Sequence, residues 1–427
     1  MFTVNATAAT NNQKVESKEY NSYEILNYNP EFVCDNDTLT GAYRSVILDN
    51  ESKDVLCVAP PKSVTFDHFR ECGSVPEING VLDCLLDKPG LGWLQDSHVS
   101  SLVITEMIEG TMVNLFYDER AKTWEIASKG AVGGNYWYFR TSYENVGHDT
   151  PQLTFRDMFL DALQAPRGIP LNDVALLNEM PKNYMYSFVL QHPNNHIVLN
   201  ITHPTLYLVA AYQVETVNRE TGDSRVRTVP LSEIELYSFN RSVNNVIMFP
   251  REVPASDLKY DMLMGDAHIF KVGYMLSDKV SGLRTAIPNP AYKEVKELRG
   301  NHPNLQYQYF ALFQAGKIRE FLEYFPAYNN LFYRFHVQSM NFIQEVHDAY
   351  VTYYIKKRGK QVRINKCVFN HIFKLHREVY LPSIESGEPT IVTRKVVSEY
   401  FNAMEPKEKL YHVNYKMREP IAVTENA

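Results

Sequence analysis

Short segments of β-branched and aromatic residues dominate the first two thirds of the chain. Asp, Asn and Pro residues end most of these segments, a pattern that predicts strands between about residues 30 and 290. One helical repeat interrupts them, where Phe155, Phe159 and Leu163 fall on one face. We therefore expect a sheet-rich unit with a helical insertion. Its clearest predicted strands cover residues 45–48, 55–58, 112–117, 124–127 and 196–199.

The hydrophobic period changes after about residue 295. Apolar positions 318, 321, 322 and 325 recur at helical spacing, as do positions 342, 346, 350 and 353. Pro326 and Pro382 are expected to break helices. The pattern predicts an α+β protein in which a domain built on antiparallel sheets precedes an α-helical C-terminal domain.

Domain limits follow from where these patterns begin and end. Residues 1–28 are rich in Asn, Thr, Ala, Glu and Lys without periodicity, which is typical of a flexible N-terminal arm. We expect the sheet domain over residues 29–294, the helical domain over residues 295–415 and a C-terminal tail over residues 416–427. The length of 427 residues agrees with two folded units.

The composition limits which cellular compartments and which binding partners are expected. The net charge is −7, so any contact with a polyanion must come from a locally basic surface. Five scattered cysteines, without a CxxC pair or a zinc-type spacing, favour reduced thiols in a cytosol-like compartment. No secretion signal and no run of 18 apolar residues occur, so a cytoplasmic protein without a membrane partner is expected.

Thirteen histidines raise the question of a metal site. His192, His196 and His203 are close in sequence, but a predicted turn after His192 separates the first two. His371 and His376 are not spaced i, i+4, and no HExxH motif occurs. These patterns predict surface or hydrogen-bonded histidines and no metal site.

Four segments of the sheet domain carry candidate chemistry. They are residues 41–48 (GAYRSVIL), 59–66 (APPKSVTF), 106–111 (EMIEGT) and 186–198 (YSFVLQHPNNHIV). In this order and spacing they resemble the covalent nucleotidyltransferases, the superfamily of ATP-dependent RNA ligases and mRNA-capping enzymes. The resemblance implies that Arg44 and Lys62 approach a triphosphate, that Phe188 stacks on the base and that Lys129 faces the nucleotide. The alternatives are a core position for Phe188 and plain solvent exposure for Lys129.

The third segment resembles the superfamily's nucleophile motif, in which a lysine precedes an acid, a glycine and Ser or Thr. Glu109, Gly110 and Thr111 fit this motif, and the resemblance implies that Glu109 and Gly110 contact the nucleotide. The lysine position holds Met107. A thioether has no amine to attack an α-phosphate, so covalent nucleotide transfer is not expected.

Other motif positions also depart from the family. Ser187 and Val272 stand where the ligases carry acids, and Ala286 stands at a lysine position. We therefore assign no catalytic residue. The resemblance implies a degenerate member that binds a nucleotide (ATP, GTP or a cap), or an RNA end, without covalent transfer.

The C-terminal part adds a further resemblance and a charge pattern. Residues 292–307 and the helices after them resemble RNA ligase-like proteins of large eukaryotic DNA viruses, which implies a host cytoplasm or a virion. No acidic residue occurs between Asp348 and Glu378, while eight basic residues and several aromatics do, as a phosphate-backbone contact requires. The residues expected to bind RNA are Lys356, Lys357, Arg358, Lys360 and Arg363.

Three interpretations remain open at the level of the sequence. The first is the degenerate binding protein, with RNA as its partner and protein contacts through the helical domain. The second is an active RNA ligase with a displaced nucleophile, for which Lys122 and Lys129 are candidates. The third is a structural or assembly subunit of a viral particle or complex. A solvated basic surface with inward-pointing aromatics is the alternative for the C-terminal stretch.

Overall fold

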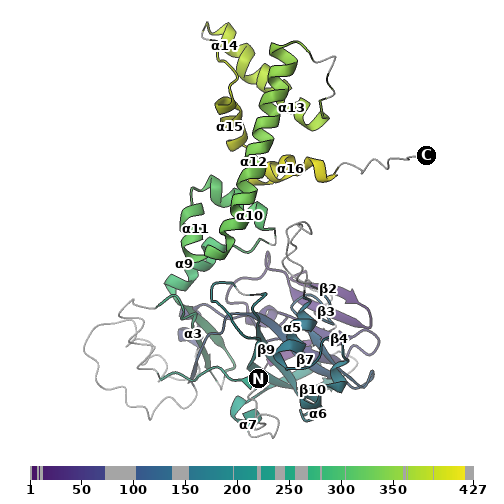
Figure 1. Cartoon of the computed structure of the whole chain (residues 1–427). Helices are drawn as coiled ribbons and strands as arrows, with labels where there is room; N and C mark the ends of the chain where they lie inside the picture. The colour runs from purple at the N-terminus through teal and green to yellow at the C-terminus, as the bar shows by residue number, and fades with distance from the viewer. Residues whose placement is uncertain are drawn as a thin grey trace, which may run out of the picture. The chain divides into compact units, whose positions relative to one another are not determined.

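A computed structural model shows how these segments fold (Figure 1). The chain divides into two compact units, and among the described residues the first ends at Glu297 and the second begins at Leu298. We call them the sheet unit and the helical unit. The structure describes residues 2–6, 9, 13–72, 102–136, 153–195, 197–218, 223–235, 246–254, 268–278, 281–302, 304–358, 362, 364–387 and 389–418.

The sheet unit is built on a sheet of seven strands. Its order is β1-β11-β10-β9-β7-β8, with β12 added beside β10. Every pair is antiparallel except β10 with β12, which is parallel. The strands are β1 (Phe2–Asn5), β7 (Thr111–Asp118), β8 (Thr123–Ala127), β9 (Met185–Gln191), β10 (Thr205–Asn218), β11 (Asp223–Val229) and β12 (Ile247–Met248).

Two smaller antiparallel sheets complete this unit, in the orders β2-β3-β4-β5 and β14-β13-β6. Their strands are β2 (Val15–Tyr20), β3 (Tyr23–Tyr28), β4 (Val46–Asp49), β5 (Val55–Val58), β6 (Leu102–Glu106), β13 (Gly273–Asp278) and β14 (Arg284–Pro288). The helices are α2 (Thr38–Gly41), α3 (Phe66–Cys72), α5 (Phe155–Ala162), α6 (Ala175–Asn178), α7 (Leu231–Glu235) and α9 (Pro290–Arg299), with a 3-10 turn at Leu171–Asp173. The last two residues of α9 belong to the helical unit.

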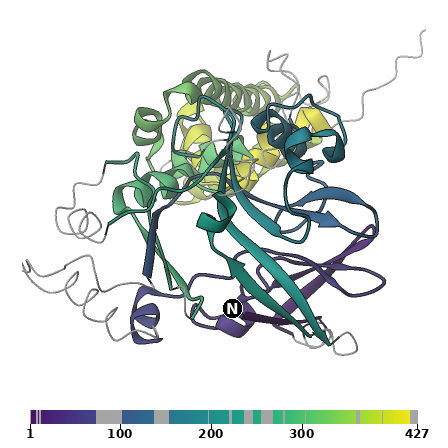
Figure 2. The ribbon, with the colours of Figure 1, turned by 90° about the horizontal axis from the view of Figure 1, so that it is seen from below.

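The middle of the large sheet is buried on both faces, which explains the almost continuous apolar sequence of β9. Tyr186 and Phe188 pack in the same core as the buried face of α5. Met185, one position out of phase, belongs to a second core shared with Ile25 and Leu26 of β3. Figure 2 shows the N-terminal strands (purple) beside the long β10–β11 pair (teal).

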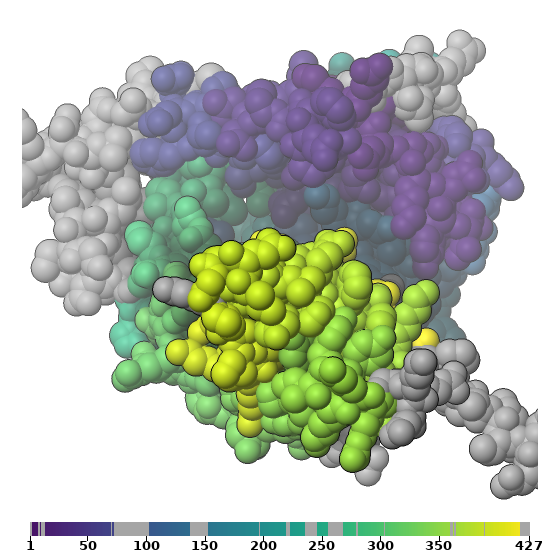
Figure 3. Space-filling model, turned by 90° about the horizontal axis from the view of Figure 1, so that it is seen from above, coloured from purple at the N-terminus to yellow at the C-terminus, as the bar shows by residue number. Residues whose placement is uncertain are grey.

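The helical unit packs into one continuous body, coloured green to yellow in Figure 3. Its longest helix, α12 (Asn329–Tyr350), buries Phe332, Phe335 and Phe342 at helical spacing. No helix that the structure describes is both long and apolar enough to cross a bilayer. The other helices are α10 (Leu305–Gln314), α11 (Ile318–Tyr324), α13 (Lys366–Leu375), α14 (Leu381–Glu385), α15 (Arg394–Asn402) and α16 (Pro406–Val413). Single turns complete the unit: 3-10 turns at Pro326–Tyr328 and Tyr415–Arg418, and π-helical turns at Val351–Ile355 and His376–Tyr380.

The predicted fold class, antiparallel sheets followed by a helical C-terminal domain, is confirmed. The prediction of a flexible arm is wrong for residues 15–28, because β2 and β3 pair with each other and β3 pairs with β4. Pro382 does not end a helix. Helical conformation continues through a π-helical turn to Glu385, and the wider turn accommodates the proline.

Candidate functional site

Backbone hydrogen bonds bring together two of the segments that the sequence singled out and the strand that carries Ala286. The amide of Lys62 donates to the carbonyl of Gly41 (2.9 Å), three residues before Arg44. The amide of Val64 donates to the carbonyl of Arg284 on β14 (3.0 Å). Two distant basic residues, Arg44 and Arg284, are therefore held on neighbouring parts of the sheet unit.

Arg284, Arg44 and Tyr212 form a group that we call the arginine site. The Arg284 guanidinium interacts with the hydroxyl of Tyr212 on β10, and the charge of Arg44 acts on both groups. Burial raises the pKa of Tyr212 to about 12 against the opposing influence of the arginines. Burial also lowers the pKa of Arg284, and repulsion by Arg44 adds to this decrease.

The positive charge of the arginine site is not neutralised within the described residues. No described carboxylate forms an ion pair with Arg44 or Arg284, whereas Arg120 has two such partners and Arg167 has one. The Nε of Arg284 is buried and lacks a hydrogen-bond partner among those residues. Two half-buried guanidinium groups in this state favour an anion with several oxygen acceptors, such as a phosphate.

Lys62 lies at the same segment but is engaged locally. Its Nζ forms an ion pair with Asp35 at 2.7 Å and donates to the carbonyl of Cys34 at 3.3 Å. This interaction lowers the pKa of the Asp35 carboxyl. Because Asp35 is 77% exposed, the pair is weak and an incoming phosphate can compete for Lys62.

Glu109 has a structural environment that the sequence did not predict. The side chain is 4% exposed, and its carboxylate accepts from the amides of residues 197, 198 and 199 at 2.9, 3.0 and 3.1 Å. The hydroxyl of Tyr292 donates to it at 2.7 Å, and this contact, after burial, raises the pKa of Tyr292. Glu109 therefore anchors a loop and α9, and its oxygens are already satisfied.

Gly110 is required by close packing within the protein. Its φ is +155°, and a Cβ at this position would lie 2.4 Å from the carbonyl oxygen of Leu190 on β9. The predicted strand over residues 196–199 is wrong, because Ile197 to Leu199 turn their amides toward Glu109. His196 lies outside the described residues.

The prediction that Phe188 stacks on a base is wrong. The side chain is 1% exposed and packs edge-on against Phe159 of α5, with ring centroids 6.1 Å apart. Tyr186 stacks on it from the same strand, at 6.3 Å. Phe188 points to the helix-covered face of the sheet because neighbouring strand residues alternate, and Ser187 takes the other face.

The positions that depart from the ligase motifs have neutral partners. Ser187 donates to Asn114 at 2.8 Å within the sheet, and Val272 is buried. Ala286 pairs with Met275 in the β13–β14 ladder. The amide of Met107 donates to the carbonyl of Gly273 at 2.9 Å, which fixes its backbone and supplies no nucleophile.

Neither candidate for a displaced nucleophile occupies the Met107 position. Lys122 lies in the β7–β8 turn, where it pairs with Glu119 at 2.9 Å and both side chains are 70% exposed. The length of β7 places this turn about 23 Å from Thr111. Lys129 is exposed and lies over the ring of Tyr28, 4.8 Å from its centroid.

Three of the five basic residues expected to bind RNA lie among the described residues of the helical unit. Lys356, Lys357 and Arg358 are exposed and follow the π-helical turn that extends α12. Lys360 and Arg363 lie outside the described residues. Lys366 and Lys374 of α13 are exposed as well. The three described residues thus form a solvent-facing basic turn.

The interleaved aromatics mostly face inward. Tyr354 stacks on His376, with ring centroids 3.8 Å apart, and Tyr353 contacts Phe369 edge-on at 5.3 Å. Phe373 is the exception, since it is 47% exposed with Arg377 over its ring. These aromatic rings are therefore not free to stack on several bases, and RNA would contact this segment mainly through its positive charge.

No protein-family model matches the chain, and no curated protein is significantly similar to it. Among solved structures, an archaeal ATP-dependent RNA ligase is 11% identical, covers 96% of this chain and 94% of its own, and has a TM-score of 0.38. A putative ATP-dependent DNA ligase from Aquifex aeolicus is 10% identical, with coverage of 80% and 79% and a TM-score of 0.37. A Naegleria gruberi RNA ligase with PPi is 11% identical, with coverage of 67% and 94% and a TM-score of 0.30. At this level the similarity carries no argument about function.

Arg284 is the residue that sequence reasoning missed. It lies two positions before Ala286 on β14, so the two share one face of the strand. The sequence therefore held a signal for this site, because Arg284 lies on the same face of the strand as Ala286, the position at which the ligases carry a lysine. Its partner Tyr212 was not predictable, because β10 and β14 belong to different sheets.

Proposed function

We propose that the sheet unit binds the phosphates of a nucleotide or of an RNA end without becoming covalently linked to it. The observation that supports this proposal is the arginine site, where Arg44 and Arg284 lack a carboxylate partner among the described residues. One guanidinium group can donate two parallel hydrogen bonds to two oxygens of a phosphate, and partial burial strengthens these bonds. ATP, GTP and a cap structure all present the required phosphates.

We infer the absence of covalent transfer from the chemistry of residue 107. A phosphoramide bond to the α-phosphate requires a side-chain amine, and Met107 has none. Ser187, Val272 and Ala286 are uncharged, so they cannot replace the acids and the lysine that the ligase motifs carry. We therefore propose that the protein binds its ligand without catalysis, as an RNA ligase-like pseudoenzyme.

RNA is the partner that we propose for the helical unit. Lys356, Lys357 and Arg358 supply exposed positive charge on a chain with a net charge of −7. Contacts with phosphates along a strand give affinity that depends on salt and little on sequence. A viral, virion-associated or cap-binding protein of the cytoplasm is consistent with this combination.

Radiolabelled ATP and GTP provide the test. We expect saturable binding under native conditions and no label on the protein after denaturing electrophoresis. Arg284→Gln and Arg44→Gln are expected to weaken binding at least tenfold each, since each removes a charged phosphate contact. Arg227→Gln is the matched control, because Arg227 is an exposed arginine of β11 that hydrogen-bonds to Gln213.

Each alternative predicts a different result. A covalent adduct resistant to denaturation would support an active ligase with a displaced nucleophile, and either Lys122→Gln or Lys129→Gln would then abolish it. Absence of binding to nucleotides, cap analogue and RNA would contradict the proposal and favour a structural or assembly subunit.

A further inference from the structure

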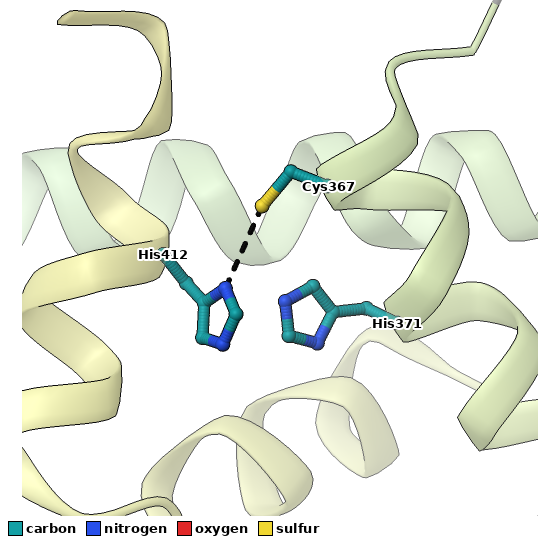
Figure 4. A group of neighbouring side chains, drawn as sticks. All are labelled: Cys367, His371 and His412. Atoms are coloured by element: carbon teal, nitrogen blue, oxygen red, sulfur yellow. Dashed lines mark hydrogen bonds between the residues drawn. The ribbon is translucent and has the colours of Figure 1, made fainter. Parts of the chain in front are cut away.

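Three side chains with metal-binding atoms converge in the helical unit. Cys367 and His371 lie one turn apart on α13, and His412 approaches them from α16 (Figure 4). Residues at i and i+4 share a helix face, which brings the first two together. The third ligand lies 45 positions after Cys367 in the chain.

The spacing of their donor atoms fits a tetrahedral ion. The Sγ of Cys367 lies 3.5 Å from the Nδ1 of His412, and the three donor atoms all lie within 4.8 Å of one another. Zinc bonds of about 2.3 Å to sulfur and about 2.05 Å to nitrogen give a tetrahedral S–N edge of about 3.6 Å. The remaining pairs lie within 4.8 Å, so closing them to tetrahedral edges requires side-chain movements of about 1 Å at most.

His371 is oriented as a metal ligand is. Its Nδ1 is 2.9 Å from the hydroxyl of Tyr400 on α15, which fixes the tilt of the ring. Its Nε2 is buried and lacks a hydrogen-bond partner among the described residues, and Figure 4 shows the ring beside His412. A buried nitrogen without a partner is costly unless an ion or water occupies the space. The Tyr400 contact is the outer support that histidine ligands commonly have.

We propose that Cys367, His371 and His412 form a binding site for a zinc-class divalent transition-metal ion that ties α16 to α13. The ligand set of one thiolate and two imidazoles suits zinc and disfavours Mg²⁺ and Ca²⁺, which bind oxygen. On binding, the Cys367 thiol releases its proton to solvent and the sulfur donates an electron pair to the ion. No fourth His, Cys, Asp or Glu joins the group among the described residues, so water or an added ligand takes the fourth position.

The surroundings disfavour the protonated form of both imidazoles, and a metal ligand has to be neutral. Burial lowers the pKa of His371 to about 3, with His412 and Lys374 contributing. Burial also lowers the pKa of His412, where Glu408 opposes the decrease and Arg418 and Lys374 add to it. These influences accompany the geometry on which the proposal stands.

The test loads the full-length, metal-free protein with Zn²⁺ or Co²⁺. We expect one ion per chain by elemental analysis, and with cobalt a thiolate charge-transfer band together with the visible absorption of a tetrahedral ion. Cys367→Ser, His371→Gln and His412→Gln are each expected to remove both signals. Cys34→Ser and His203→Gln, at exposed positions, are the matched controls and should retain them.

A second measurement separates binding from folding. Tyr400→Phe keeps all three ligands and removes only the contact to His371, so we expect about tenfold to hundredfold weaker binding. Added zinc should raise the Tm of the wild type and not that of the ligand variants. A folded wild type that binds neither ion, or ligand variants that bind as the wild type does, would overturn the proposal.

Discussion

Glu109 is the residue at which the sequence motif and the structure differ most. The motif implies a nucleotide ligand and the structure shows a buried structural anchor, and Glu109→Gln separates these two roles. The substitution keeps the size of the side chain. It replaces one carboxylate oxygen by an amide group, which then faces the backbone N–H groups of residues 197–199 and the hydroxyl of Tyr292. Donors would face donors in a site that is 4% exposed.

The expected cost follows from these contacts. A hydrogen bond to a charged acceptor contributes about 1.5–3 kcal/mol, and an unsatisfied buried donor costs a similar amount. We therefore expect Glu109→Gln to lower the free energy of unfolding of the sheet unit by about 2–4 kcal/mol. For a unit of this size the decrease corresponds to about 5–15 °C in Tm.

Thermal unfolding followed by circular dichroism measures this effect. Glu119→Gln is the control, because its ion pair with Lys122 is exposed and is expected to contribute less than about 1 kcal/mol. The reasoning is refuted if Glu109→Gln melts with the control and nucleotide binding is abolished, since Glu109 would then be a ligand.

Three further outcomes are expected. Phe188→Ala should cost about 3–5 kcal/mol of stability by emptying a core position, and a loss of nucleotide affinity at unchanged Tm would restore the base-stacking role. The metal-free helical unit should lose stability as the pH falls below 6.5 towards 3, because the unfolded state binds a proton that the buried His371 does not. The free energy of unfolding should fall with a slope approaching about 1.4 kcal/mol per pH unit. Chemical denaturation at several pH values should show a flatter profile for His371→Gln. Substitution of Lys356, Lys357 and Arg358 by Gln should lower the slope of log K for RNA against log salt. The decrease should be about 0.7 for each phosphate that the protein no longer neutralises. An unchanged slope in filter-binding assays would mean that the basic turn is merely solvated.

The strands with local signals were predictable. Residues 55–58 and 124–127 are short, β-branched or aromatic, and ended by turn residues, and both form strands close to the expected limits. β2 carries no such signal, because residues 16–19 are exposed and polar while only its partner β3 buries Ile25 and Leu26. A strand stabilised through its neighbour has little pattern of its own.

The candidate site was less predictable because its contacts are long-range. Glu109 meets residues 197–199 across 88 to 90 positions, so a motif of six residues could not indicate that its carboxylate is satisfied. The metal ligands illustrate the same limit. The i, i+4 spacing of Cys367 and His371 was visible in the sequence, but His412 joins them only through the packing of α16 against the rest of the unit.

Calorimetric titration of ATP into the wild type and into the Arg44→Gln/Arg284→Gln double variant tests the central claim most directly. The account predicts one noncovalent site in the wild type. In the double variant it predicts binding weaker by about 2.8 kcal/mol, a hundredfold higher Kd, because each of the two substitutions removes a contact worth at least a factor of ten. The Arg227→Gln control should bind as the wild type does. Equal affinity of the double variant and the wild type would contradict the account, because phosphate recognition would then lie elsewhere.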